Sequence, residues 1–329
     1  MNDSFRDLFS ILVRPAGRLA GVQGWLRNSV WSEERFAGLS PRDYLETGER
    51  MARFADDLIL SGAPQLYDEL VAAAESSMSL LAVARQPKSA LVVLDGSSIR
   101  ELPLILQLAG QTGFTAAEVR YAVAGLPSDT MSFVEQRLIG KRVAPSQLET
   151  RKELKEAGIV ARYYDSTIRV HELQGLGDSL LLWSSFPDGT YMNFEAKSSG
   201  HFEAIVKQFD VVWKNVVLSI PRGYRIVVTS DHGYAYLNSG YDSEFKAEKA
   251  LTFLENNRSR ILGPEEASPL EIPELQYVEQ RRTVMLRGRV KNRPQGPSAN
   301  KVYRHGGMSL MEMLTPYVVL EHESSKGGS

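Results

Sequence analysis

The sequence contains no cysteine among its 329 residues. This absence excludes disulfide bonds, thiol nucleophiles and thiolate metal ligands together, so any bound metal must use oxygen and nitrogen donors. The net charge is also small, at −2 from 38 basic and 40 acidic side chains. No global field therefore drives the chain onto nucleic acid or anionic lipid, and such contact would need a local patch of charge.

Long apolar runs are missing as well. Near the amino terminus, Arg14 and Pro15 interrupt a short apolar stretch, which fits neither a signal peptide nor a membrane span of about 20 apolar residues. We therefore expect a cytoplasmic protein without membrane contact. The hydrophobic fraction of 43% is ordinary for a globular chain and allows a substantial core.

The apolar residues of the first part of the chain recur at helical spacing. This pattern predicts a small helical N-terminal region over residues 1–88, followed by a larger α/β domain over residues 89–323. Residues 140–178 carry a charged helix, interpreted either as a possible cap near the site or as a solvated face. The tail, residues 324–329, is predicted to be disordered.

Three short apolar runs, at residues 89–94, 179–183 and 224–229, show no alternation and predict strands that are buried on both faces. Helical patterns lie between them, so we expect a largely parallel sheet flanked by helices. Ligand sites in such sheets lie beyond the carboxyl ends of the strands. Asp95, Asp188 and the pair Asp231 and His232 directly follow these runs, which predicts that acidic groups converge there.

Histidine is scarce, with five in the chain, and two of them lie in glycine-flanked loops: His232 and His305. Carboxylate and imidazole donors without thiolate suit Zn²⁺ or Mn²⁺, as one or two ions. Paired metals are a standard device for in-line displacement at phosphorus, so the composition of the site indicates phosphate or sulfate ester hydrolysis. His171 and His322 are interpreted as surface residues.

A hydroxyl nucleophile is available in the segment Leu126-Pro127-Ser128-Asp129-Thr130, just before a predicted helix at residues 131–139. A hydroxyl at a helix N-terminus can be polarised there, and free N–H groups can hold a phosphoryl group. Ser128 or Thr130 could equally serve as the cap of this helix, a frequent role for both residue types.

In chain order, these segments resemble the PglZ domain of the alkaline phosphatase superfamily, whose members are associated with bacterial defence against phage. The resemblance covers roughly residues 90–320 and rests on four motifs: Val92-Val93-Leu94-Asp95, Leu126-Pro127-Ser128-Asp129-Thr130, Thr229-Ser230-Asp231-His232-Gly233 and His305-Gly306-Gly307-Met308-Ser309-Leu310-Met311-Glu312-Met313. It implies an alkaline-phosphatase-like fold and a metal-dependent hydrolase.

The resemblance also implies roles for individual residues. One metal would be held by Asp95, Asp231 and His232 together with the nucleophile Thr130, and a second by His305 and Asp188. Superfamily phosphodiesterases place a histidine four residues after this aspartate, where the present chain has Met192. His201, with Glu195 nearby, is the candidate replacement, although it could simply begin the helix that follows.

A basic run precedes His305 and includes Arg289 and Arg304, and Arg100 lies in the loop after the first strand. Positive charge beside a phosphoryl site predicts a nucleic acid or nucleotide substrate, whereas charge on a strand can also protect an exposed sheet edge. The leading hypothesis is a phosphodiesterase or nuclease. The alternatives are a catalytically eroded module that binds partner defence proteins, with residues 1–88 as a docking region, and a phosphomonoesterase or sulfatase.

Overall fold

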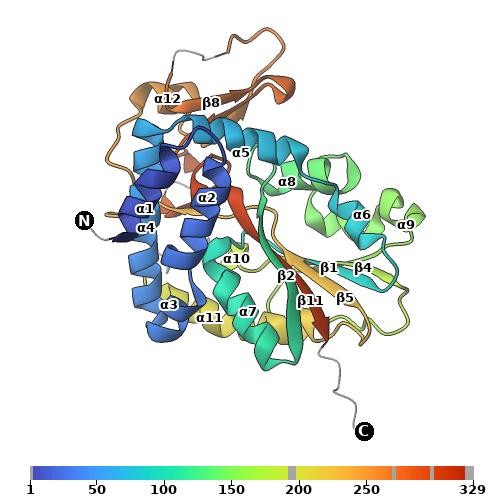
Figure 1. Cartoon of the computed structure of the whole chain (residues 1–329). Helices are drawn as coiled ribbons and strands as arrows, with labels where there is room; N and C mark the ends of the chain where they lie inside the picture. The colour runs from blue at the N-terminus through green and yellow to red at the C-terminus, as the bar shows by residue number, and fades with distance from the viewer. Residues whose placement is uncertain (1–2, 192–197, 269–271, 297–299, 323–329) are drawn as a thin grey trace.

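The computed structural model describes residues 3–191, 198–268, 272–296 and 300–322. In this part of the chain the main sheet has six strands in the order β2-β11-β5-β1-β4-β3 (Figure 1). Five of these strands run in the same direction, and β11 alone runs antiparallel to both of its neighbours. The predicted α/β class with a largely parallel sheet is confirmed. The strands are β1 (Ser89–Leu94), β2 (Phe114–Val123), β3 (Val160–Tyr164), β4 (Ser179–Ser184), β5 (Arg225–Thr229) and β11 (Leu314–His322).

Helices cover both faces of this sheet, because each face is apolar. Along β1, Val92 joins the larger core with α7 and α11, and Val93 joins a second core with α6, η3 and α9. All six residues of β1 are buried, as the unbroken apolar run predicted. The covering helices are α6 (Leu80–Ala84), α7 (Leu102–Gln111), α8 (Thr130–Phe133), η3 (Val134–Ile139), α9 (Lys152–Glu156), α11 (His201–Val212) and η6 (Trp213–Val217).

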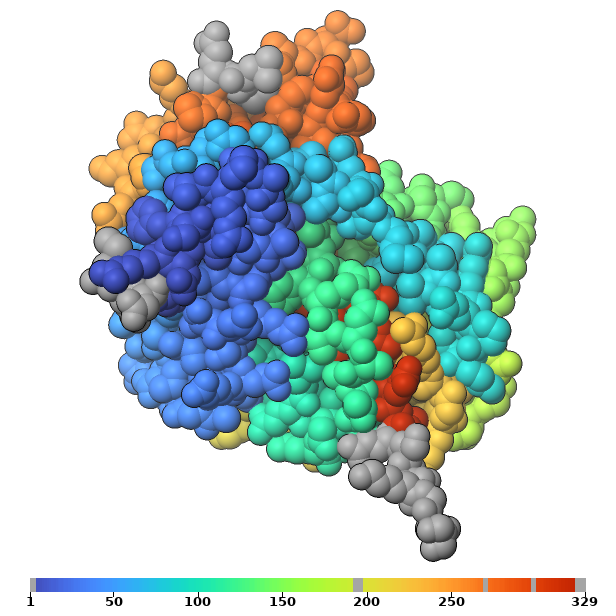
Figure 2. Space-filling model, in the orientation of Figure 1, coloured from blue at the N-terminus to red at the C-terminus, as the bar shows by residue number. Residues whose placement is uncertain are grey.

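The expected N-terminal helices are present, and they pack directly on the sheet layer. Leu8 and Leu45 belong to the same apolar core as Val92, and the space-filling view shows the blue helices merging with the rest of the molecule (Figure 2). The longest helix begins where Ser40 caps it and Pro41 occupies its first position. These helices are α1 (Asp3–Leu12), α2 (Arg18–Trp25), η1 (Leu26–Val30), α3 (Glu33–Gly38), α4 (Pro41–Gly62) and α5 (Gln65–Ser76).

Residues 140–178, interpreted from the sequence as a possible cap or a solvated face, contribute a strand to the main sheet. The segment forms η4 (Pro145–Thr150), α9 and then β3, which pairs in parallel with β4 as the edge strand of the main sheet. Ala161 and Tyr164 are buried in this strand, so its pairing and burial place it within the α/β core.

The described part of the chain has two smaller sheets, of which the three-stranded one, with β8, lies above the main sheet in Figure 1. The basic segment around residue 285 forms the central strand of one of them, not an exposed edge. Helix α12 (Glu248–Phe253) ends just before Glu255 and Asn256, both of which have positive φ. The elements are β6 (Ala235–Tyr236), β10 (Tyr303–Arg304), α12 (Glu248–Phe253), β7 (Ser259–Ile261), β8 (Leu275–Val278) and β9 (Thr283–Leu286).

Within the described ranges, no helix has both the length and the apolar character needed to span a bilayer. Three subjects of the sequence predictions lie outside these ranges: Met192, Glu195 and the tail at residues 324–329.

Candidate metal centre and nucleophile

The acidic strand ends meet because β5, β1 and β4 are neighbours in the sheet. Hydrogen bonds join the three loops that follow: Asp188 donates its backbone N–H to the Asp95 carbonyl at 2.9 Å, and Gly96 donates its N–H to Asp231 Oδ1 at 3.0 Å. Gly96 has a φ of 75°, and a Cβ there would lie 2.4 Å from the Tyr234 ring. Glycine is thus needed for both conformation and space.

Two further segments reach the same edge from the other side of β5. Thr130 follows β2, and His305 precedes β11 through the short helix α13 (Leu310–Met313). Because β11 is antiparallel, its beginning lies where the parallel strands end, so the residues before it arrive at the site. Ala124 donates its N–H to the Met313 carbonyl at 2.8 Å, which joins the two segments.

The structure brings together six of the seven predicted metal-site residues. Ligand atoms of Asp95, Asp231 and His232 all lie within 4.8 Å of one another, and those of Asp188, His232 and His305 form a second such group. His232 Nε2 lies 3.4 Å from Asp231 Oδ2 and 3.8 Å from Asp95 Oδ1. The sixth residue, Thr130, places its hydroxyl beside the first group.

Thr130 is the first residue of α8, and its hydroxyl is not used to cap that helix. Asp129 is the cap, because its carboxylate accepts from the Ser132 N–H at 2.7 Å. The Thr130 Oγ1 instead donates to Asp231 Oδ2 at 2.7 Å and lies 3.2 Å from His232 Nε2. The hydroxyl therefore points at the candidate ligands.

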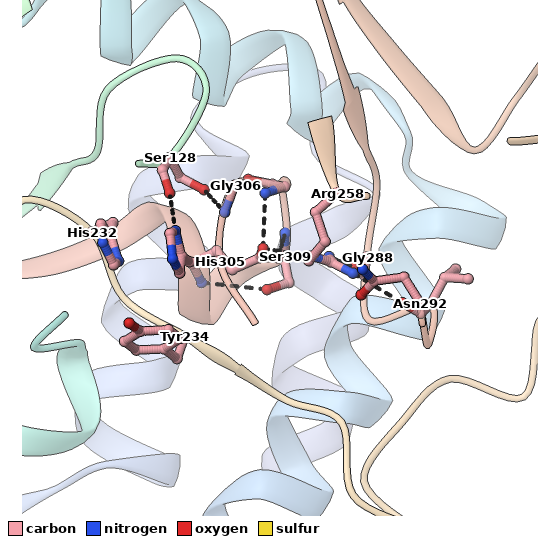
Figure 3. A network of polar contacts seen from close by, with 12 residues as sticks. Ser128, His232, Tyr234, Arg258, Gly288, Asn292, His305, Gly306 and Ser309 are labelled. Carbon is pink, nitrogen blue, oxygen red and sulfur yellow. Dashed lines mark hydrogen bonds and ion pairs between the residues drawn. The ribbon is translucent and has the colours of Figure 1, made fainter. Parts of the chain in front are cut away.

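Ser128, the other candidate nucleophile, has a structural role. Its hydroxyl donates to the Gly307 carbonyl at 2.8 Å. It also accepts from the Gly306 N–H at 3.0 Å, as Figure 3 shows. Its own carbonyl lies 3.3 Å from His305 Nδ1. Ser128 thereby connects the loop of Thr130 to the loop of His305.

Both histidines of the site present the same ring nitrogen to the acidic groups. His232 Nδ1 lies 3.1 Å from the Gly233 carbonyl, and His305 Nδ1 faces the Ser128 carbonyl. An imidazole that donates its Nδ1 proton to a carbonyl keeps the lone pair on Nε2 for a metal. The two rings stack with centroids 4.1 Å apart.

The electrostatics of this cluster favour a bound cation. Burial and the negative charges of Asp231 and Asp188 raise the pKa of Asp95 well above its ordinary value. Burial also raises the pKa of Asp188 to about 6 and, with the neighbouring His232, holds the pKa of His305 well below its usual range. A divalent cation offsets such mutual repulsion among buried carboxylates.

Asp95 provides a direct test of whether these residues fit a metal. Its Oδ2 accepts from the Trp183 indole N–H at 3.1 Å, whereas its Oδ1 is buried and has no hydrogen-bond partner among the described residues. A buried carboxylate oxygen without a partner is costly unless it binds a cation. The donor set of carboxylate, imidazole and hydroxyl fits Zn²⁺ or Mn²⁺.

His201 is the predicted ligand that the structure does not bring to the cluster. Its Nδ1 lies 2.5 Å from the Ser198 carbonyl, and its Nε2 lies 2.9 Å from the Tyr303 hydroxyl. The ring packs among tyrosines at the start of α11. Both ring nitrogens are thus engaged, which matches the alternative that His201 begins the helix.

The predicted substrate-binding arginines are placed inside the protein, which corrects their assignment. Arg100 and Arg289 are fully buried, and both form ion pairs with the buried Glu49, at 2.8 Å and 2.5 Å. Arg304 is only 6% exposed in β10, where burial lowers its pKa to about 10. The sequence predicted that these arginines bind a phosphate. It could not show that Glu49, which is far from both in the chain, pairs with Arg100 and Arg289 inside the core.

Two residues near the site were not assigned to it from the sequence. Trp183 was recognised as part of β4, and its pairing opposite Val93 directs the indole N–H to Asp95. Lys301 is half-buried and lowers the pKa of both Asp188 and His305 through its positive charge. Its position four residues before His305, within the basic run, was the available signal.

Comparison with known proteins adds little to this picture. No family model matches the sequence, and no curated protein matches it. Among solved structures, the phosphonoacetate hydrolase from Sinorhizobium meliloti 1021 in complex with phosphonoacetate is similar at 13% sequence identity and a TM-score of 0.39. The alignment covers 71% of this chain and 90% of that one, and a similarity of this degree supports no statement about the reaction.

Proposed function

We propose that this protein is a metal-dependent hydrolase of phosphoric esters, and that Thr130 is its nucleophile. The observation that carries the proposal is the position of the Thr130 hydroxyl, 2.7 Å from Asp231 and 3.2 Å from His232 Nε2, at the edge of a buried acidic cluster. The ordered motifs that resemble the PglZ domain support membership of the alkaline phosphatase superfamily.

Asp95, Asp231, His232 and Thr130 would hold one divalent ion. When bound, such an ion lowers the pKa of a coordinated hydroxyl and offsets the charge of phosphoryl oxygens. Asp188 and His305 share His232 with the first group, and the described residues supply no separate third ligand to them. We infer one strong site and one weaker site.

The reaction proceeds in two displacements at phosphorus. The Thr130 oxygen, once its proton has passed to solvent, forms a bond to phosphorus, and the hydrogen bond of its hydroxyl to Asp231 Oδ2 holds it in place beforehand. The bond from phosphorus to the leaving oxygen breaks, and that oxygen takes a proton from water. A water molecule then attacks the phosphothreonine ester and gives up a proton to solvent. The bond from phosphorus to the Thr130 oxygen breaks and that oxygen takes a proton from solvent, which releases the phosphate product and restores the Thr130 hydroxyl.

A diester is the proposed substrate class, with nucleotides or nucleic acid as the first compounds to examine after a model substrate. The resemblance to superfamily phosphodiesterases supports the diester. The argument for nucleotides came from the basic run, and the burial of Arg100 and Arg289 removes that support. The resemblance to the PglZ domain supports a place in phage defence, with partner proteins docking on the N-terminal helices.

The test is hydrolysis of bis-(p-nitrophenyl) phosphate and p-nitrophenyl phosphate by metal-stripped protein, with Zn²⁺ or Mn²⁺ added back. We expect metal-dependent turnover of the diester above the monoester, lost in Thr130→Ala and partly kept in Thr130→Ser, which retains a hydroxyl. Faster monoester turnover would assign a phosphomonoesterase. Turnover that persists in Thr130→Ala would overturn the nucleophile assignment.

The second candidate is a PglZ-like module without activity that binds defence proteins. It is favoured by the engagement of both His201 ring nitrogens, which leaves the second metal group short of a ligand of its own. Absence of turnover with either ester and either ion, in a protein shown to be folded, would select this candidate.

A further inference from the structure

Glu312 lies in the short helix α13, between the two histidine-bearing loops, and bonds to both of them. Its Oε1 accepts from the Gly307 N–H at 2.8 Å, and its Oε2 accepts from the Ser309 N–H at 3.0 Å. Its backbone carbonyl accepts from the Gly233 N–H at 3.0 Å. Glu312 therefore holds the backbone at Gly307, two residues after His305, and at Gly233, one residue after His232.

Arg258 holds this carboxylate from the opposite side. Its Nε and Nη2 donate to the two oxygens of Glu312 at 2.5 Å and 2.6 Å, and both side chains are buried. The remaining donors bind backbone carbonyls, with Nη1 on Val290 at 2.9 Å and Nη2 also on Gly288 at 2.6 Å. A two-pronged pair of this kind fixes orientation as well as distance.

Arg258 and its carbonyl partners belong to the module of β7, β9 and β8. The same module contacts the loop through its backbone, because the Leu286 carbonyl at the end of β9 accepts from the Met308 N–H at 2.9 Å. Figure 3 shows this network of polar contacts, with Ser128 and Gly306 on one side and Arg258 and Gly288 on the other. A Cβ at Gly307 would lie 2.8 Å from the guanidinium, so the loop packs closely on Arg258.

We propose that Arg258 and Glu312 are positioning residues for the metal centre, through which the three-stranded module sets the places of His305 and His232. This inference rests on the proposed function, because it concerns how the candidate ligands are held. Neither residue touches the ligand atoms themselves. Outer partners of this kind change metal affinity by about 10- to 100-fold when they are removed.

The experiment compares Glu312→Gln with the parent protein by calorimetric titration with Zn²⁺ and Mn²⁺, by the visible absorption of Co²⁺-loaded protein, and by amide hydrogen exchange of the loop. Glutamine keeps the size and one acceptor, but presents an N–H₂ group to donors. We expect at least tenfold weaker metal binding, an altered Co²⁺ spectrum and faster exchange at Gly307 and Ser309. Arg258→Lys, which keeps the charge but not the fork, should show a smaller change in the same direction.

Glu69→Gln is the matched control. Glu69 also accepts from an arginine and a backbone N–H, from Arg18 at 3.1 Å and Leu19 at 2.9 Å, but it joins N-terminal helices. Parent-like metal affinity in Glu312→Gln, or equal losses in Glu69→Gln, would overturn the positioning role. Failure of the parent protein to bind either ion would overturn the proposed function, and the exchange data would then decide separately whether Glu312 holds the loop. Should Glu312→Gln not fold, Arg258→Lys decides by the same readouts.

Discussion

The Ser128 hydroxyl forms two hydrogen bonds with the loop of His305: it donates to the Gly307 carbonyl and accepts from the Gly306 N–H. Only two residues later, Thr130 points its hydroxyl at Asp231. One short segment thus carries a serine that organises the backbone and a threonine that is placed for chemistry. The two hydroxyls are distinguished by their partners.

Replacing Ser128 by alanine should weaken the site without removing the nucleophile. The change leaves the buried Gly306 N–H and Gly307 carbonyl without their partner, at a cost of about 1 to 3 kcal/mol in unfolding free energy. Denaturant unfolding and ester hydrolysis check this, with reduced but measurable turnover expected. Ser97→Ala is the control, since Ser97 is equally buried but its hydroxyl has no partner among the described residues. Complete loss of turnover in stable Ser128→Ala would contradict the assigned role.

Asp95→Asn should stabilise the metal-free protein and abolish its stabilisation by metal. Asp95 is buried beside Asp231 and Asp188, and neutralising it relieves their repulsion. In the parent protein, metal at about 100 times its Kd should add about 2.7 kcal/mol to the unfolding free energy. Thermal unfolding with and without Zn²⁺ checks both parts. If, in the absence of metal, the variant is less stable than the parent, then repulsion among the carboxylates does not destabilise the parent protein.

Trp183→Phe should weaken metal binding by about 10- to 100-fold, because the indole N–H that orients the Asp95 carboxylate is lost. The matched control is Trp213→Phe. The Trp213 indole N–H donates to the hydroxyl of Thr112, the residue that follows helix α7, at 3.0 Å. Metal titration of both variants checks the prediction. Equal effects at the two positions would attribute the loss to packing.

The buried Asp56 should make stability depend on pH. Its carboxylate accepts from the Leu310 N–H, and burial raises its pKa to about 7. The folded state therefore retains a proton that the unfolded state loses near pH 4, so this group's contribution to stability falls as pH rises from about 4 to 7. Relative to Asp56→Asn, the parent should lose about 2 to 3 kcal/mol between pH 5 and pH 8. Unfolding free energies that change in parallel for both proteins would contradict this.

The sequence was informative about the sheet centre and the acidic strand ends because both depend on local pattern. Uninterrupted apolar runs marked β1, β4 and β5, and the residues directly after them form the cluster. Strand β11 was not predicted, since Pro316 lies within it and proline is unusual inside a sheet.

The roles of charged residues were harder to predict, because they depend on partners far apart in the chain. Arg100 and Arg289 are residues of the type that binds phosphate on a protein surface. In the structure, however, Glu49 from helix α4 pairs with both of them inside the core. Nothing near either arginine in the sequence indicates that partner. The different roles of Ser128 and Thr130 likewise could not be predicted from the sequence, because the partner of the Ser128 hydroxyl lies in the distant loop of His305.

The position of β11 between β2 and β5 imposes an order on folding. Strand β2 ends at Val123 but reaches the sheet only through β11, which begins at Leu314. During synthesis, β2 therefore stays unpaired in the nascent chain until β11 has been made, after the other strands of the main sheet. The nucleophile follows β2 and His305 precedes β11, so the nascent protein assembles its reactive centre only when that last strand enters the sheet.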